Sequence, residues 1–266
     1  MLLIRSFMPV NHTFAQWVLA PEGSPLQRGR ADHHAFKDTI MAMALRSTAR
    51  GFPALTGGAR TYLYRPLKRI GDLAISAAAL IALAPVMACV ALVIKLDDGG
   101  PVLFKQRRIG YQGEDFTMLK FRTMRTDAED ILPEVTHDIA GTELEAEPKL
   151  FKLKDDPRII RSGKFLRQSS IDELPQLFNV LVGQMSLIGP RPPLPREYAQ
   201  YCDEEKRRMS VKPGLSGLWQ VMGRSNLSWE ETIELDLYYV ENRNTSLDLS
   251  IFFRTFKVVL SRDGAY

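Results

Sequence analysis

The sequence has little cysteine and little histidine, with two cysteines and four histidines among its 266 residues. Cys89 lies inside an apolar run, Cys202 lies far from it, and neither has another cysteine or a histidine nearby. This spacing argues against a disulfide framework and against a zinc site. The adjacent pair His33 and His34 has no third histidine or cysteine nearby in the sequence, so a solvated pair is favoured over a metal site.

A large excess of charge of one sign is also lacking, since 35 basic residues face 31 acidic ones. The net charge of +4 and the pI near 9.0 modestly favour anionic partners such as phosphates, nucleic acid or a lipid surface. The N-terminus, MLLIRSFMPVNH, has too short an apolar run for a secretory signal. Residues 1–60 show no sustained hydrophobic period and predict a weakly ordered N-terminal extension.

One long apolar run is present at residues 73–94, LAISAAALIALAPVMACVALVI, and it contains no charged residue. As a straight helix it is roughly 33 Å long, which is enough to cross a hydrocarbon core. Pro85 near its middle removes one backbone hydrogen bond and bends the helix. Basic residues flank both ends, so the positive-inside rule does not choose an orientation. We expect residues 61–98 to form a membrane-inserted, re-entrant helix broken at Pro85, with a spanning helix as the alternative.

The remaining residues, 99–266, predict one small domain of strands and helices, and the whole chain predicts an α+β fold. Residues 101–124 hold two runs of β-forming residues around IGYQG, which is typical of a β-hairpin. The acidic, irregular residues 127–149 predict a surface loop. Helices are expected at 197–209, 228–241 and 246–260, and we expect the hairpin to pack on several helices.

The segment FLRQSSIDELPQLFNVLVGQMSLIGPRPP, residues 165–193, carries two adjacent carboxylates, Asp172 and Glu173. Ser170 and Glu173 match a capping box, but that helix would place Pro175 at its fifth position, where the missing N–H is costly. With Asp172 as the cap, Pro175 falls at the third position and Gly183 ends the helix. This second helix start is therefore the predicted one.

A helix start of this kind is also a good place for phosphate groups. Arg167 lies just before this helix and Arg191 just after the next strand, where flanking prolines restrict its backbone. Both arginines can bind phosphate in a bidentate manner. A carboxylate among them favours the ionised state and could act as a nucleophile or bind a divalent metal. From the residues alone, capping and catalysis are equally supported.

Three further segments hold candidate site residues. For each of them a structural role explains the residues at least as well as a role in binding. Lys120 and Arg122 in KFRTM share one face of a strand, which could equally be solvated or meet anionic lipid. Residues 217–231 combine aromatic and polar side chains that could bind a nucleobase, although core or membrane-interface packing is favoured there. Asp236 lies on an apolar helix face and needs a partner, for example an arginine.

Together these motifs resemble the bacterial sugar transferase family, the monotopic polyprenyl-phosphate phosphoglycosyl transferases. The resemblance covers about residues 65–262. It rests on ordered motifs: KRIGDL, an apolar segment with a central proline, GPVLFKQRRIG, KFRTM, DDPRI, LRQSSIDELPQLFNVLVGQMSLIGPRP, VKPGLSGLWQVMGR and ELDLYYV. One departure is Ala84 before Pro85, where many relatives have serine.

The resemblance implies transfer of a sugar-1-phosphate from a UDP-sugar to polyprenyl phosphate, with release of UMP. It implies that residues 99–266 form a cytoplasmic catalytic domain, that the protein lies at the cytoplasmic leaflet of the inner membrane, and that Mg²⁺ is a cofactor. Downstream glycosyltransferases are possible partners. Asp172 is then the nucleophile and Glu173 its metal-associated partner, so both are expected metal ligands. Lys120, Arg167 and Arg191 are the expected phosphate binders, and the possible substrate-binding residues are Arg122, Gln220, Arg224 and Asp236.

Two alternatives belong to other classes of protein. A non-catalytic membrane-surface adaptor would use the basic hairpin to bind anionic lipid heads, and Asp172 would only cap a helix. Nucleic-acid binding is not expected, because the basic residues surround a membrane segment and the charge is close to balance.

Overall fold

The computed structural model describes residues 57–128, 156–223 and 227–261. The described part forms one compact unit from Gly58 onward. The extension predicted at 1–60 lies almost wholly outside the described residues, and so does most of the acidic loop predicted at 127–149.

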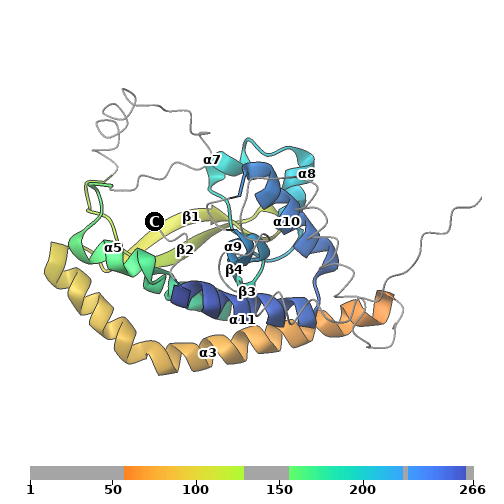
Figure 1. Cartoon of the computed structure of the whole chain (residues 1–266), viewed down its shortest axis with the longest axis horizontal. Coiled ribbons are helices and arrows are strands. Elements are labelled where there is room, and N and C mark those ends of the chain that lie inside the picture. Colours follow the sequence, from red (N-terminus) through yellow and green to blue (C-terminus); the bar gives the residue numbers. More distant parts are fainter. Residues whose placement is uncertain (1–56, 129–155, 224–226, 262–266) are drawn as a thin grey trace, which may run out of the picture. The chain divides into compact units, whose positions relative to one another are not determined.

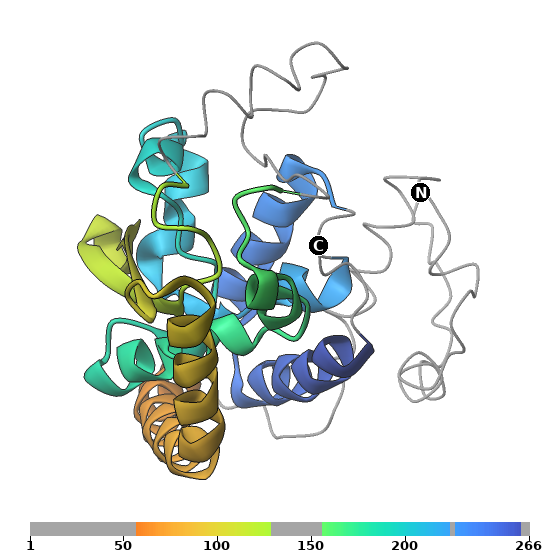
Figure 2. The same cartoon turned by 90° about the vertical axis from the view of Figure 1, so that its left-hand side faces the viewer.

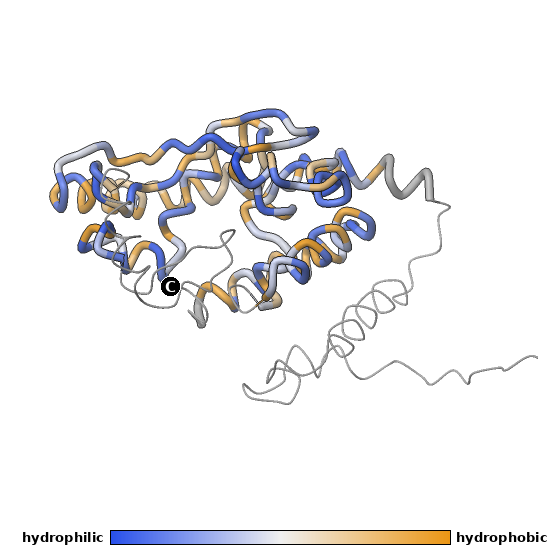
Figure 3. Tube along the Cα trace, turned by 90° about the horizontal axis from the view of Figure 1, so that it is seen from above, coloured by the Kyte–Doolittle hydropathy of each residue, from blue (hydrophilic) through white to orange (hydrophobic). Residues whose placement is uncertain are grey.

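Helix α3, Gly57–Asp98, contains the apolar run and is long and apolar enough to cross a membrane. Of its most apolar window only 6% is buried, which is the opposite of the core helix of a soluble protein. In Figure 3 hydrophobic colour dominates the helix between its charged ends. The helix runs without interruption through Pro85 and bends along its course (Figure 1), so the expected break is a bend inside one continuous helix.

The predicted hairpin is confirmed. Strands β1, Leu103–Ile109, and β2, Asp115–Phe121, pair antiparallel through the one-turn helix η1, Tyr111–Gly113. Seen from the C-terminal end of α3, the hairpin follows that helix directly (Figure 2). Phe121 packs in a core cluster with Val90 and Ile94 of α3.

The segment 161–188 folds into short elements around the Asp-Glu pair. These are α5 (Arg161–Gln168), η2 (Ile171–Glu173), α6 (Gln176–Val182) and β3 (Ser186–Ile188). Strand β3 pairs in parallel with β4, Gly214–Ser216. The predicted helix end at Gly183 is confirmed, because this glycine has a left-handed φ of 87° after the last turn of α6.

The C-terminal part is helical, as expected, with one difference. The helices predicted at 228–241 and 246–260 are α10, Trp229–Asn242, and α11, Thr245–Ser261. The helix predicted at 197–209 is wrong as one element. It is divided into α7 (Pro195–Tyr198), α8 (Asp203–Lys206) and the one-turn helix η3 (Arg207–Ser210), and α9 (Leu218–Met222) follows β4.

The N-terminal half of α3 is fixed to the rest of the compact unit by polar contacts. Arg69 donates to the carbonyl oxygens of Val180 and Leu181, at 2.6 and 2.7 Å, and so supplies a cation to the C-terminus of α6. One turn later, the Asp72 carboxylate accepts hydrogen bonds from the Ser186 hydroxyl and the Leu187 amide of β3, at 2.8 and 3.1 Å.

The C-terminal end of α3 is fixed to the same domain. Asp97 accepts hydrogen bonds from the amide and the hydroxyl of Ser162, at 2.9 and 2.8 Å, at the start of α5. Asp98 forms an ion pair with Arg122. Both ends of the apolar helix are therefore attached to one compact unit.

Candidate active site

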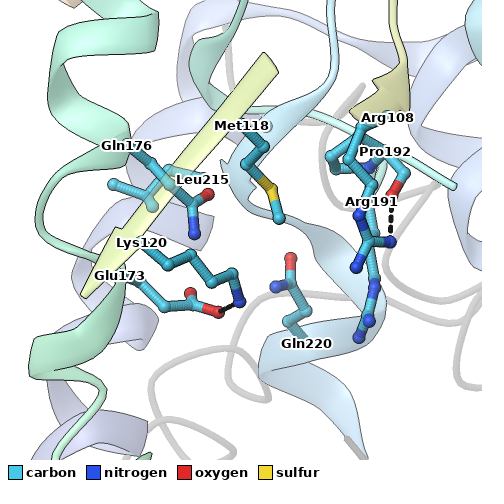
Figure 4. A pocket seen from close by; sticks show the side chains of 10 residues that line it. Arg108, Met118, Lys120, Glu173, Gln176, Arg191, Pro192, Leu215 and Gln220 are labelled. Atoms are coloured by element: carbon cyan, nitrogen blue, oxygen red, sulfur yellow. Dashed lines mark hydrogen bonds and ion pairs between the residues drawn. The ribbon is translucent and has the colours of Figure 1, made fainter. Parts of the chain in front are cut away.

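A pocket opens where the hairpin meets the Asp-Glu segment and the loop after β3 (Figure 4). Three cationic side chains and one carboxylate surround it, together with two amides and a few apolar groups. Its lining residues are Arg108, Met118, Lys120, Glu173, Gln176, Arg191, Pro192, Gly214, Leu215 and Gln220. This excess of positive charge makes the pocket suitable for an anion that carries more than one negative charge.

An ion pair between Lys120 and Glu173 lies on one side of the pocket (Figure 4). The Lys120 Nζ atom is 2.8 Å from Glu173 Oε1 and donates a hydrogen bond to it. Burial raises the pKa of Glu173, but attraction to Lys120 and then to Arg191 and Arg108 outweighs it, and the pKa lies below its usual value. Glu173 is therefore ionised at neutral pH.

Asp172 lies beside this pair and is buried, with 8% of its surface exposed. Burial raises its pKa to about 6, and the charge of Glu173 adds to this effect, while Lys120 and Arg167 oppose it. Glu173, not Asp172, lines the pocket. The two neighbouring carboxyl groups thus have opposite pKa shifts, which is characteristic of functional sites.

The local backbone explains how two successive carboxylates reach this position. Ser170 has a left-handed φ of 56°, an uncommon conformation for a residue other than glycine, and it turns the chain out of α5. The single turn of η2 then presents both Asp172 and Glu173 before α6 begins. Strained backbone of this kind is found preferentially at functional sites.

The predicted helix cap at Asp172 is wrong. Helix α6 begins at Gln176, its N-cap residue is Pro175, and no side chain caps it. Ser170 does not form a capping hydrogen bond with η2 either. Pro175 explains the difference: it needs no N–H at a helix start, so the regular helix begins just after it and leaves the carboxylates in a separate turn.

Arg191 and Arg108 occupy the other side of the pocket. The Arg108 guanidinium donates a hydrogen bond of 2.9 Å to the Pro192 carbonyl oxygen. The Ile109 amide donates one of 3.0 Å to the Pro193 carbonyl oxygen. These bonds fix the loop that carries Arg191 against the end of β1. Burial, and then repulsion from Arg191, lower the pKa of Arg108 to about 10. Two cations held together in this way favour an anion between or beside them.

Sequence reasoning missed Arg108 as a site residue. The signal was available in the hairpin pattern, because β1 and β2 pair antiparallel and side chains alternate between the two faces. Arg108 lies on the same face as Met118 and Lys120, whereas Arg107 lies on the other face and is exposed. Without a register, the basic residues of the hairpin could not be told apart.

The other expected phosphate binder, Arg167, is close to Asp172 but does not line the pocket. Its Nε atom donates a hydrogen bond of 3.0 Å to the Thr123 hydroxyl. Burial lowers the pKa of Arg167, and the charges of Asp172 and Asp156 oppose this. Arg167 therefore acts on Asp172 by its charge without lining the pocket.

Arg122 and Lys120 serve different contacts, although alternation along one strand predicts a shared face. Strand β2 ends at Phe121, so the alternation no longer applies to Arg122. Its guanidinium forms the ion pair with Asp98 and donates 2.6 Å to the Pro101 carbonyl oxygen. Arg122 thus connects the hairpin to the end of α3 and does not line the pocket.

The remaining candidates have different surroundings. Gln220, on α9, lines the pocket, and its buried Oε1 atom has no hydrogen-bond donor among the described residues. Asp236 is fully buried in α10 and pairs with Arg208, which donates from Nε at 3.0 Å and from Nη2 at 2.5 Å. The partner expected for this aspartate is thus an arginine. Arg224 lies outside the described residues.

Asp172 and Glu173 suit a magnesium ion only if water and substrate phosphates supply the other ligands. In the described ranges no cluster of three or more histidine, cysteine, aspartate or glutamate side chains could hold a metal ion. Mg²⁺ is usually held by one or two carboxylates together with water and substrate phosphates. Asp172 and Glu173 fit that pattern, and Glu173 Oε1 is already paired with Lys120.

The family model of the bacterial sugar transferases matches residues 63–262. The fold and the site thus define a membrane-associated protein with an anion-binding pocket, and the chain belongs to the bacterial sugar transferase family. It is 45% identical over 205 residues to the undecaprenyl-phosphate galactose phosphotransferase of Salmonella typhimurium, covering 76% of this chain and 42% of that protein.

Two other relatives extend the comparison. The exopolysaccharide production protein ExoY of Sinorhizobium fredii is 38% identical over 232 residues, which are 85% of this chain and all of that protein. The undecaprenyl-phosphate glucose phosphotransferase of Komagataeibacter xylinus is 41% identical over 201 residues, 71% of this chain and 35% of that protein. The chain spans less than half the length of the two phosphotransferases.

Proposed function

We propose that this protein transfers a sugar-1-phosphate from a UDP-sugar to a polyprenyl phosphate, producing a polyprenyl-diphosphate-sugar and UMP. The observation that carries the proposal is the pocket in which Lys120, Arg108 and Arg191 surround Glu173, the neighbour of the buried Asp172. Both substrates are phosphates, so cations must offset their charge before a carboxylate can approach. Relatives named as undecaprenyl-phosphate sugar phosphotransferases support the same reaction.

In the first step, a carboxylate oxygen of Asp172 attacks the β-phosphorus of the UDP-sugar. A bond forms between that oxygen and the phosphorus, the bond from the phosphorus to the bridging oxygen breaks, and UMP leaves. In the second step, a phosphate oxygen of the polyprenyl phosphate attacks the same phosphorus and displaces the Asp172 carboxylate. The two steps let one site serve a water-soluble donor and a lipid acceptor in turn.

The cations of the site have separate tasks in this mechanism. Arg191 and Lys120 bind phosphate oxygens in the pocket, and Arg108 adds charge while it positions the Arg191 loop. Arg167 favours the ionised form of Asp172 by its charge. Asp172 and Glu173 would hold a Mg²⁺ ion, which would supply further neutralisation of phosphate charge. Gln220 would accept a hydrogen bond from the donor substrate.

The pKa of Asp172 predicts the pH dependence of the first step. Below about 6 the carboxyl group is protonated and is not a nucleophile, so the rate of UMP release should rise with pH through about 6 and level off above it. Single-turnover UMP release, measured between about pH 5 and pH 8, checks this. A rate that falls as the pH rises across this range would contradict an Asp172 nucleophile.

We propose that α3 enters and leaves the membrane on the cytoplasmic face of the bacterial inner membrane. Both ends of its apolar run, 73–94, are flanked by residues that bond to one domain, Asp72 and Asp97, whereas a spanning helix would separate them.

This topology predicts that both flanks of α3 are accessible from the cytoplasm. A tag placed before residue 60 and a tag placed after residue 266 should both react with a cytoplasmic reporter, and neither with a periplasmic one. Opposite reports from the two tags would overturn the re-entrant topology and restore the spanning helix.

The function itself is tested by measuring UMP. Membranes that contain the protein, incubated with undecaprenyl phosphate and a UDP-sugar, should release UMP, and a screen of UDP-sugars identifies the donor. UDP-galactose and UDP-glucose come first, because relatives are named for galactose and glucose. No UMP with any UDP-sugar would favour the membrane-surface adaptor. The lipid product has to be extended by a glycosyltransferase, which is the expected downstream partner.

A further inference from the structure

An exposed phenylalanine, Phe104, lies on the pocket-facing side of the hairpin. Phe104 of β1 is paired with Lys120 of β2, and residues directly opposite in an antiparallel pair project their side chains to the same face. That face also carries Met118 and Arg108, which line the pocket with Lys120. Phe104 remains 41% exposed, whereas Met118, further along the same face, is 3% exposed.

Phe104 has a pocket cation as its cross-strand neighbour and follows the apolar helix closely in the chain. That neighbour is Lys120, whose ammonium group faces the pocket. In the chain, β1 follows the C-terminal end of α3, where Leu92 and Leu96 are 59% and 77% exposed. In Figure 1 the hairpin starts at this end of the apolar helix. A single exposed phenylalanine is ordinary on a protein surface, but this one lies directly opposite a cation of the pocket, on the hairpin face that does not pack against α3.

We propose that Phe104 forms a binding subsite for the isoprenoid chain of the polyprenyl phosphate, at the point where the chain joins its phosphate. This inference rests on the proposed function, which supplies the acceptor. In that lipid the apolar chain begins one bond from the phosphate ester oxygen, so a phosphate bound by Lys120 requires an apolar surface close by. Directly opposed residues have Cβ atoms about 5 Å apart, which is the required proximity.

The subsite should act on the acceptor and not on the nucleotide-sugar donor. A UDP-sugar has no apolar chain, so contact with Phe104 contributes nothing to its binding. The isoprenoid chain gains by burying the exposed ring, and removal of most of that ring should weaken acceptor binding roughly tenfold. The expected signature is therefore a change of the acceptor KM alone.

The test compares Phe104→Ala with Leu103→Ala in the full chain, purified in detergent. Leu103 is the matched control, because it is 39% exposed at the same end of β1 but projects to the opposite face, paired with Phe121. The probes are undecaprenyl phosphate as acceptor and a UDP-sugar that the wild-type protein accepts. Release of UMP without acceptor measures the donor step separately.

We expect Phe104→Ala to raise the KM for undecaprenyl phosphate about tenfold and to leave the donor step unchanged. Phe104→Leu should restore most of the acceptor affinity, whereas the polar Phe104→Gln should behave like Phe104→Ala and provides a second variant if alanine impairs folding. An acceptor KM within about twofold of wild type in both the alanine and glutamine variants would overturn the subsite, as would an equal rise for Leu103→Ala. If the wild-type protein itself releases no UMP, the proposed function fails instead.

Discussion

Replacement of Asp172 by asparagine should lower the turnover of sugar-phosphate transfer by at least about a thousandfold, because it removes the nucleophile. The amide has nearly the same shape as the carboxyl group but cannot form the bond to phosphorus. Steady-state UMP release in the presence of undecaprenyl phosphate measures the loss. The exchange also removes a buried acid whose pKa is raised to about 6, so the fold should tolerate it.

The control for this substitution is Asp115→Asn, at the start of β2 in the same compact unit. Asp115 forms an exposed ion pair with Arg107 on the face away from the pocket, and exposed pairs contribute little to stability. Its variant should keep nearly full turnover. Glu173→Gln should also lower turnover, since Glu173 lines the pocket, but its covalent step would remain possible. An Asp172→Asn variant as active as Asp115→Asn would exclude the covalent mechanism.

Breaking the buried ion pair of Asp236 and Arg208 should lower the free energy of unfolding by about 3–5 kcal/mol. Asp236 is fully buried and Arg208 is 2% exposed, so Asp236→Asn leaves a buried guanidinium without its counter-ion. The same guanidinium lies over the rings of Tyr201 and Trp229 and donates 3.1 Å to the Tyr201 hydroxyl. Denaturant unfolding of the purified protein measures the loss.

A neighbouring ion pair provides the control. Arg207 bonds to Glu241, and both side chains are about half exposed. Glu241→Gln should therefore change the unfolding free energy by less than about 1 kcal/mol. The double variant Arg208→Met with Asp236→Leu should recover part of the stability lost by Asp236→Asn, because it removes both buried charges. If Asp236→Asn leaves stability intact and instead raises the donor KM, Asp236 binds substrate.

The sequence was sufficient for the elements whose local signals agree. The apolar run is hydrophobic almost throughout, β-forming runs flank IGYQG, and the two C-terminal helices have helical patterns; the structure confirms each of these elements. The parallel pairing of β3 with β4 could not be predicted, because each strand has three residues and they are far apart in the chain. The predicted helix start at Asp172 was wrong. Pro175 is compatible with a helix that begins before it and with one that begins just after it, and the structure has the second.

The candidate site shows a similar division. Single residues with distinctive neighbours, such as Lys120, Glu173 and Arg191, are brought together at one pocket. Arg108 was missed because its role depends on strand register and on a hydrogen bond to Pro192, 84 positions away. Asp236 was expected to need a partner, but only the fold reveals that Arg208 fills that position. Long-range contacts of this kind leave no local pattern in one sequence.

The most direct test of the covalent mechanism is the mass of the protein after incubation with a UDP-sugar in the absence of acceptor. The account predicts one equivalent of UMP and a sugar-phosphate adduct on the peptide that contains Asp172, which disappears when undecaprenyl phosphate is added. Fragmentation of that peptide should place the adduct on Asp172 and not on Glu173. Release of UMP only when acceptor is present, with no adduct on the protein, would contradict the account and indicate direct transfer between the two substrates.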